Sequence, residues 1–189
     1  MGSIRFLTEP MKVMKKRQNE MWEMDYDIAA CYWTDREKDS VSLDPDDLKK
    51  RIDDFIEGHN TCALATASPD IVRCTPIEYN YLEGAFYLFS EGGLKFKALK
   101  ENKRVGLAIY ESYGGFGNLN SLQVEGRAEI IEPFSEEYMK LLEYKKIPVK
   151  AIKKMPHPMN LIKIIPEIFD YLDSDLKKEE LSGRQHYVV

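Results

Sequence analysis

The sequence predicts an α+β domain that is mainly β, with about six strands in an antiparallel barrel or meander and three or four added helices. Short apolar or alternating runs of the kind found in strands recur between residues 61 and 172. Most of them are joined by turns or loops that are too short for the crossovers of a parallel sheet. This pattern argues for an antiparallel barrel and against a doubly wound parallel sheet.

Composition narrows the class of protein further. The 189 residues suit one domain, or one domain with an extension, and the net charge of −5 argues against nucleic-acid binding. Three cysteines without a C-x-x-C pair indicate a reducing compartment, the cytoplasm. No apolar run approaches the ~18 residues of a membrane span, so we expect no membrane association.

Residues 1–43 are expected to form an arm with a helix, and residues 44–189 the barrel domain. Within the arm, the spacing of Met14, Met21 and Trp22 suits one face of a helix. The preferred interpretation is that the arm docks its Met and aromatic side chains on the barrel or on a partner subunit. The alternative is a lid over a ligand.

The barrel domain should begin with a helix that has Asp44 as its N-cap and ends at Gly58. A buried strand follows at residues 61–67, and then extended runs at 71–81 and 85–90. After them, a glycine pair at residues 92 and 93 opens a short lysine-rich helix, and a further strand begins at residue 105.

The second half of the barrel domain should contain two long strands, at residues 119–132 and 160–172. Gly126 inside the first suggests a bulge or a close backbone approach, and Pro166 inside the second suggests a bulge or a sheet edge. Ser135 should cap a helix between them.

One place collects features that suit a phosphate. Arg73 on a strand and Lys95 at the start of the lysine-rich helix supply cations, and Gly92-Gly93 allows a close backbone approach. Nearby strands carry Phe, Tyr or both, which offer flat apolar surface. A phosphate joined to an aromatic ring system is the ligand that this combination suits.

Other kinds of site find little support. His59, His157 and His186 lie too far apart in the sequence for a metal motif, and no G-x-S-x-G is present. Cys62 and Cys74 are expected to be buried strand residues rather than nucleophiles. The lysine-rich run at 145–154 is interpreted as a solvated loop face; the alternative is that it attracts an anionic partner.

The order of these segments resembles the pyridoxamine 5′-phosphate oxidase-like family, the flavin-binding split barrels. The resemblance covers roughly residues 44–175, and V-E-G-R-A-E-I at 124–130 and K-x-x-x-L-K-x-N-x-R-V at 95–105 are its most specific parts. It implies an antiparallel six-stranded split β-barrel with flanking helices. It also implies an FMN cofactor in a cleft at a homodimer interface.

The same resemblance implies roles for individual residues. Arg73 and Lys95 match the residues that contact the flavin phosphate. The strand residues beside the isoalloxazine ring match Thr75, Pro76 and Ile77, and those at the strand end near the flavin match Phe89 and Ser90. Ser121 falls where the oxidases carry a Gln.

This chain departs from the oxidases at their substrate positions. The oxidases have a Lys at the position of Glu78 to bind pyridoxal phosphate, and Tyr and Arg where this chain has Met139 and Glu143. A carboxylate at position 78 would repel a substrate phosphate. The resemblance therefore favours the flavin reductase and nitroimidazole-resistance-like branch over a true pyridoxamine phosphate oxidase.

Three functions follow from the sequence. The first is an FMN-dependent oxidoreductase that takes electrons from NAD(P)H or another donor and acts on a small molecule. The second is a split barrel that holds flavin or haem without turnover, and the third is a regulatory protein that uses the arm and the lysine run. A deazaflavin in place of FMN stays open, as does a return of Arg184 and His186 towards the flavin of the dimer.

Overall fold

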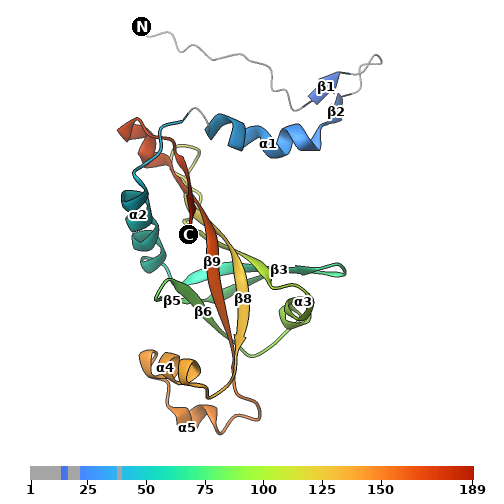
Figure 1. The fold of residues 1–189 in the computed structure, drawn as a ribbon, viewed down its shortest axis with the longest axis vertical. Helices are drawn as coiled ribbons and strands as arrows, with labels where there is room; N and C mark the ends of the chain where they lie inside the picture. Colours follow the sequence, from blue (N-terminus) through green and yellow to red (C-terminus); the bar gives the residue numbers. More distant parts are fainter. Residues whose placement is uncertain (1–13, 17–21, 38–39) are drawn as a thin grey trace. The chain divides into compact units, whose positions relative to one another are not determined.

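The N-terminal arm and the barrel are two compact units, Met1–Val41 and Ser42–Val189, and each is described by itself. The computed structural model describes residues 14–16, 22–37 and 40–189 (Figure 1). In the arm, β1 (Met14–Lys16) pairs antiparallel with β2 (Trp22–Met24), and α1 (Tyr26–Glu37) follows.

The arm contains a helix, but not where the spacing of its apolar residues placed one. Met14 and Trp22 lie in strands, and Met21 lies outside the described residues. The helix α1 has its apolar residues spread around its axis, so that the sequence shows no helical period there. Docking of the arm on the barrel or on a partner subunit stays a prediction.

The barrel unit begins with a helix and then alternates strands with short helices. None of the described helices is long and apolar enough to cross a membrane. In chain order the elements are α2 (Pro45–Glu57), β3 (Thr61–Ser68), β4 (Ile71–Glu78), β5 (Asn80–Leu82), β6 (Ala85–Ser90), α3 (Lys95–Glu101), β7 (Arg104–Tyr110), β8 (Asn120–Ile131), α4 (Glu136–Tyr144), α5 (Val149–Ile152), β9 (Asn160–Asp173), the 3₁₀ helix η1 (Ser174–Glu179) and β10 (Arg184–Val188).

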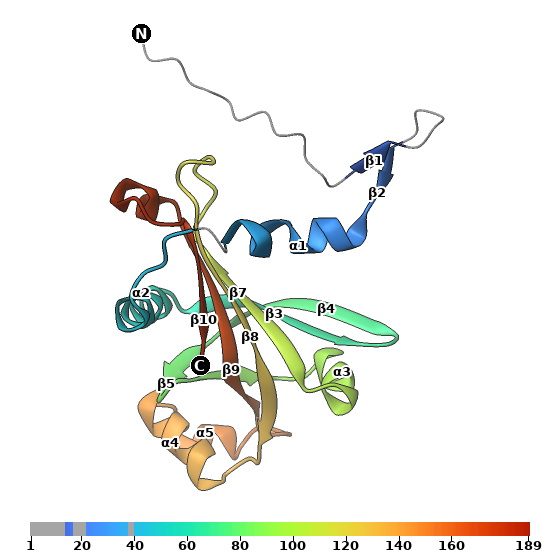
Figure 2. The ribbon, with the colours of Figure 1, turned by 45° about the horizontal axis from the view of Figure 1, so that its top comes forward.

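The strands form one antiparallel sheet in the order β4-β3-β7-β8-β9-β6-β5 (Figure 2). The first half of β9 pairs with β6, and its second half pairs with β10. The sheet therefore divides along β9, which confirms the predicted split barrel. It has eight strands rather than the six expected, because the extended run at residues 71–81 is two strands and the C-terminal tail forms β10.

A single residue, Tyr79, brings the two ends of the sheet together. It lies between β4 and β5, which are the first and last strands in the sheet order. One residue spans at most about 7 Å between its neighbours' Cα atoms, so the sheet must curl until these edges meet. The Tyr79 side chain is buried, its hydroxyl donates to the Ile56 carbonyl at 2.7 Å, and its backbone N–H donates to the Asn60 carbonyl at 2.9 Å.

Two apolar clusters lie on either side of β6. Its alternate residues Phe86 and Leu88 belong to the main core inside the barrel, against which α2 packs its apolar stripe. Ala85 and Tyr87 face the other way, into a smaller cluster with α4 and α5. Both faces of β6 are therefore packed, and this packing positions the start of the loop that leads from β6 to α3.

The predicted bulge lies at the middle of the longest strand pair. The register between β8 and β9 shifts between Glu125 and Gly126, and Gly126 lies opposite Pro166. Proline cannot donate to the ladder, and a bulge is where a central strand accommodates one. Gly126 and Pro166 therefore belong to the same irregularity.

Candidate functional site

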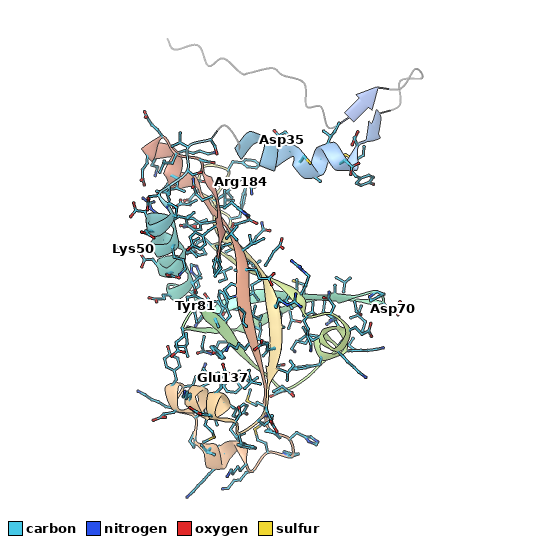
Figure 3. The ribbon with its side chains drawn as sticks, viewed as in Figure 1. Asp35, Lys50, Asp70, Tyr81, Glu137 and Arg184 are labelled. Atoms are coloured by element: carbon cyan, nitrogen blue, oxygen red, sulfur yellow. The ribbon has the colours of Figure 1, made fainter. Side chains whose placement is uncertain are left out.

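The β3–β4 hairpin and α3 build the site that the sequence predicted. Asp70, labelled in Figure 3, marks the tip of this hairpin. Arg73, Thr75 and Ile77 lie opposite Thr66, Leu64 and Cys62 in the ladder, so they share the inward face of the hairpin. Pro76 lies on the other face, opposite Ala63. The strand segment that the resemblance places beside the isoalloxazine ring therefore presents side chains to both faces of the hairpin.

The glycine pair before α3 shapes the loop that holds Lys95. Gly92 and Gly93 have φ angles of 150° and 108°, which residues with a Cβ rarely adopt. The Lys95 ammonium donates to the Gly92 carbonyl at 2.5 Å, and the side chain is buried, with 8% of the residue exposed. At the other end of α3, the Asn102 amide donates to the Ala67 carbonyl at 3.0 Å. The Asn102–Ala67 contact fastens α3 beside the hairpin that carries Arg73.

Arg73 lies near enough to Lys95 for its charge to act on the Lys95 ammonium, and within the described part of the chain neither residue is paired with a counter-charge. Burial, and then the nearby positive charge of Arg73, lower the pKa of Lys95. Neither cation makes a salt bridge within the described residues. Two close cations, one of them buried, repel each other and favour the binding of an anion that carries two negative charges.

Ser90 supports the glycine loop, whereas Phe89 faces away from it. The Ser90 hydroxyl donates to the Gly92 carbonyl and accepts from the Gly92 N–H, both at 3.3 Å. The Ser90 carbonyl accepts from the Asn160 amide at 3.1 Å. The Phe89 ring lies in the smaller cluster, edge-on to Tyr138 with 5.5 Å between the ring centroids. Ser90 therefore belongs beside the cation pair, and Phe89 lies on the far face of β6.

Ser121 lies at the other end of the strands from the cation pair. It pairs with Tyr110 at the start of β8, whereas the ladder row through Arg73 crosses Thr66, Val105 and Gly126. The offset of five positions from Ser121 to Gly126 corresponds to about 16 Å along a strand. A single chain therefore does not place Ser121 beside Arg73 and Lys95.

A hollow of about 500 Å³ lies on the outer face of the sheet, and Ser121 is part of its wall. The hollow exists because small residues from β3 and β7 face outward there and form its floor. The residues that form this floor are Ala63, Ala65, Gly106 and Ala108. Cys74 also lines the hollow and is exposed, contrary to the prediction that it is buried.

Glu78 is neutralised by a residue that sequence reasoning missed. Its carboxylate lies 2.6 Å from the Lys145 ammonium, which comes from the end of α4 and is largely buried. An unpaired Glu78 carboxylate would repel an anion, but the Glu78–Lys145 pair carries no net charge. The sequence showed only that residue 145 belongs to a lysine-rich run, because a contact across 67 positions leaves no local pattern.

The remaining polar residues fit structural roles. His59 follows the end of α2, where one ring nitrogen lies 2.7 Å from the Phe55 carbonyl oxygen. His186 in β10 contacts Asp170 of β9 at 2.7 Å, so the tail returns to its own sheet. Burial raises the pKa of the Cys62 thiol to about 12, which does not suit a nucleophile. Within the described ranges, no three metal-binding side chains converge.

Comparison with known proteins agrees with this geometry. Residues 48–173 match the family model described as pyridoxamine 5′-phosphate oxidase. The chain belongs to this family. The match spans α2 to β9 and so includes Arg73, Lys95 and the sheet that carries them. No curated protein sequence matches the chain significantly.

Solved structures with the same fold include both flavin and haem proteins. A FAD-binding protein from Mesorhizobium loti is 21% identical, with 64% of this chain and 89% of that chain covered and a TM-score of 0.53. HutZ, the heme storage protein from Vibrio cholerae, is 16% identical, with 64% and 90% covered and a TM-score of 0.53. A heme binding protein from Mycobacterium smegmatis is 15% identical, with 71% and 55% covered and a TM-score of 0.52. These likenesses concern the fold.

Proposed function

We propose that this protein is an FMN-binding oxidoreductase of the pyridoxamine 5′-phosphate oxidase family. The observation that carries the proposal is the pair of Arg73 and buried Lys95, which has no carboxylate partner within the described residues. The phosphate group of FMN would supply the negative charge that pairs with these two cations. Membership of the family and the likeness to a FAD-binding protein support a flavin as its bearer.

The residues of this chain would hold the cofactor rather than take part in bond making. Arg73 and Lys95 would bind the phosphate, and Thr75, Pro76 and Ile77 would lie beside the ring. When bound, FMN supplies the capacity to accept and release electrons. The neutral Glu78–Lys145 pair replaces the free lysine that the oxidases use for pyridoxal phosphate. We therefore propose reduction of flavins or nitro compounds in place of true pyridoxamine phosphate oxidation.

We also propose that the site is completed by a second copy of the chain. Ser121 lies far from Arg73 within one chain, and it borders an outer face whose small residues leave room for a partner. The homodimer expected from the sequence would supply Ser121 from the partner subunit. Sedimentation equilibrium measures this directly: twice the mass of one chain supports the proposal, and the mass of a single chain contradicts it.

The cytoplasm is the compartment that suits this function. Cys62 and Cys74 are free thiols in the structure, and Cys74 is exposed. An exposed thiol persists in a reducing environment. The same compartment supplies NAD(P)H, the proposed electron donor.

The electron donor can be tested on the FMN-loaded protein. Under anaerobic conditions, NADH or NADPH should reduce the bound flavin and so bleach the visible absorption of its oxidised form. Dithionite serves as the control, since it reduces any accessible flavin. Bleaching by dithionite but by neither nucleotide would favour the alternative function, a module that holds flavin or haem without turnover. Uptake of haemin in place of FMN would also favour that module.

The affinity for FMN should depend on pH through Lys95. A bound phosphate dianion stabilises the protonated ammonium, so binding raises the lowered pKa of Lys95. FMN affinity should therefore fall as the pH rises through the pKa of Lys95 in the free protein. It should also fall below about pH 6, where the phosphate gains a proton.

Fluorescence titrations with FMN from about pH 5, below the second pKa of the phosphate, to about pH 10, near the ordinary pKa of lysine, measure this dependence. Riboflavin is the control, because it shares the ring and lacks the phosphate. Lys95→Gln should remove the loss of affinity at high pH. An equal slope for FMN in the wild type and in Lys95→Gln would contradict the role of Lys95.

A further inference from the structure

Thr66 carries a buried hydroxyl that the fold leaves without a partner. The residue lies in β3 and is 2% exposed. Its Oγ1 makes no hydrogen bond within the part of the chain that the structure describes. Leaving a buried hydroxyl unpaired destabilises the fold, so such groups are rare unless a ligand or a water satisfies them.

The position of Thr66 relates this hydroxyl to the cation pair. Thr66 lies directly opposite Arg73 in the β3–β4 ladder, and opposite residues in a ladder share one face of the sheet. The helix that carries Lys95 packs on β3 and is tied to Ala67, the next residue, through Asn102. Thr66, Arg73 and α3 therefore border the same region of the barrel.

We propose that the Thr66 hydroxyl is a third ligand of the phosphate, to which it donates a hydrogen bond. The proposal rests on the function proposed above and names the ligand group as a phosphate monoester dianion. Arg73 and Lys95 would neutralise its charge, and Thr66 would satisfy one of its oxygens. Binding then supplies the partner that the hydroxyl lacks in the free protein.

The test compares Thr66→Val with Thr66→Ser in FMN and riboflavin titrations of the apoprotein. Valine keeps the shape and removes the hydroxyl, whereas serine keeps the hydroxyl. Thr66→Val should weaken FMN binding at least about tenfold, because hydrogen bonds to charged groups are worth about 1.5–3 kcal/mol. Riboflavin binding should be unchanged, and Thr66→Ser should bind FMN within about threefold of the wild type.

The stability of the apoprotein gives an independent readout. Thr66→Val removes an unpaired buried hydroxyl, so its urea midpoint should equal or exceed that of the wild type. A merely structural threonine would lower the midpoint when replaced. The combination of unimpaired stability and weakened FMN binding is therefore specific to a ligand role.

Two results overturn the proposal. One is an unchanged ratio of FMN to riboflavin affinity in Thr66→Val, whether or not both affinities fall. If the wild type takes up neither flavin, the proposed function fails, and calorimetry with inorganic phosphate decides the role of Thr66. Phosphate binding that is absent, or equal in the wild type and Thr66→Val, is then the second result that overturns the proposal. Weaker phosphate binding in Thr66→Val supports the anion site without the flavin.

Discussion

Replacing Arg73 and Lys95 together by glutamine should weaken FMN binding at least about a hundredfold. Each cation is expected to form a charge-assisted hydrogen bond with the phosphate, worth about 1.5–3 kcal/mol. Glutamine retains a long polar side chain while it removes the charge. Fluorescence titration of the apoprotein with FMN measures the loss, and riboflavin affinity should change little.

The same replacement should leave the apoprotein at least as stable as the wild type. In the free protein, Lys95 is a buried cation next to another cation, an arrangement that lowers its pKa and opposes folding. Lys97→Gln is a matched control, since Lys97 is an exposed lysine on the same helix. FMN affinity that is unchanged in the double variant, or reduced equally in Lys97→Gln, would contradict a phosphate site at Arg73 and Lys95.

Replacing Gly126 by alanine should destabilise the barrel by about 3 kcal/mol, because an added methyl group overpacks the β8–β9 pair. A Cβ at this position would lie 2.4 Å from the Ile165 carbonyl oxygen and 3.1 Å from the Pro166 Cα. Both atoms belong to backbone in the longest strand pair, so the clash cannot be relieved by a side-chain rotation.

Urea unfolding followed by circular dichroism measures this change in the free energy of unfolding. Gly117→Ala is the control, since nothing lies within 4 Å of a Cβ there and its φ does not require glycine. The control should differ from the wild type by less than about 0.5 kcal/mol. An equally small effect of Gly126→Ala would show that the bulge tolerates a side chain.

Local signals account for the parts of the fold that the sequence predicted well. The Asp44 cap, the β3–β4 hairpin and the bulge at Gly126 each depend on a few neighbouring residues, and the structure confirms them. The closeness of Arg73 and Lys95 was also predicted. It follows from the order of strand, hairpin and glycine-opened helix together with the family resemblance.

The missed features depend on contacts between distant segments. The run at 71–81 looks continuous in sequence, but Tyr79, which bonds to the carbonyls of Ile56 and Asn60, separates it into strands at the two edges of the sheet. In the same way, the charge of Glu78 could not be judged without Lys145. The helix α1 was misplaced because its apolar residues share no face.

Titration of the apoprotein with FMN and with riboflavin tests the central claim, that the Arg73–Lys95 pair is a phosphate site, most directly. If the claim is correct, FMN binds at least about a hundredfold more tightly than riboflavin, because only FMN carries the phosphate. Equal affinities for the two flavins, or no binding of either flavin or of inorganic phosphate, would contradict it.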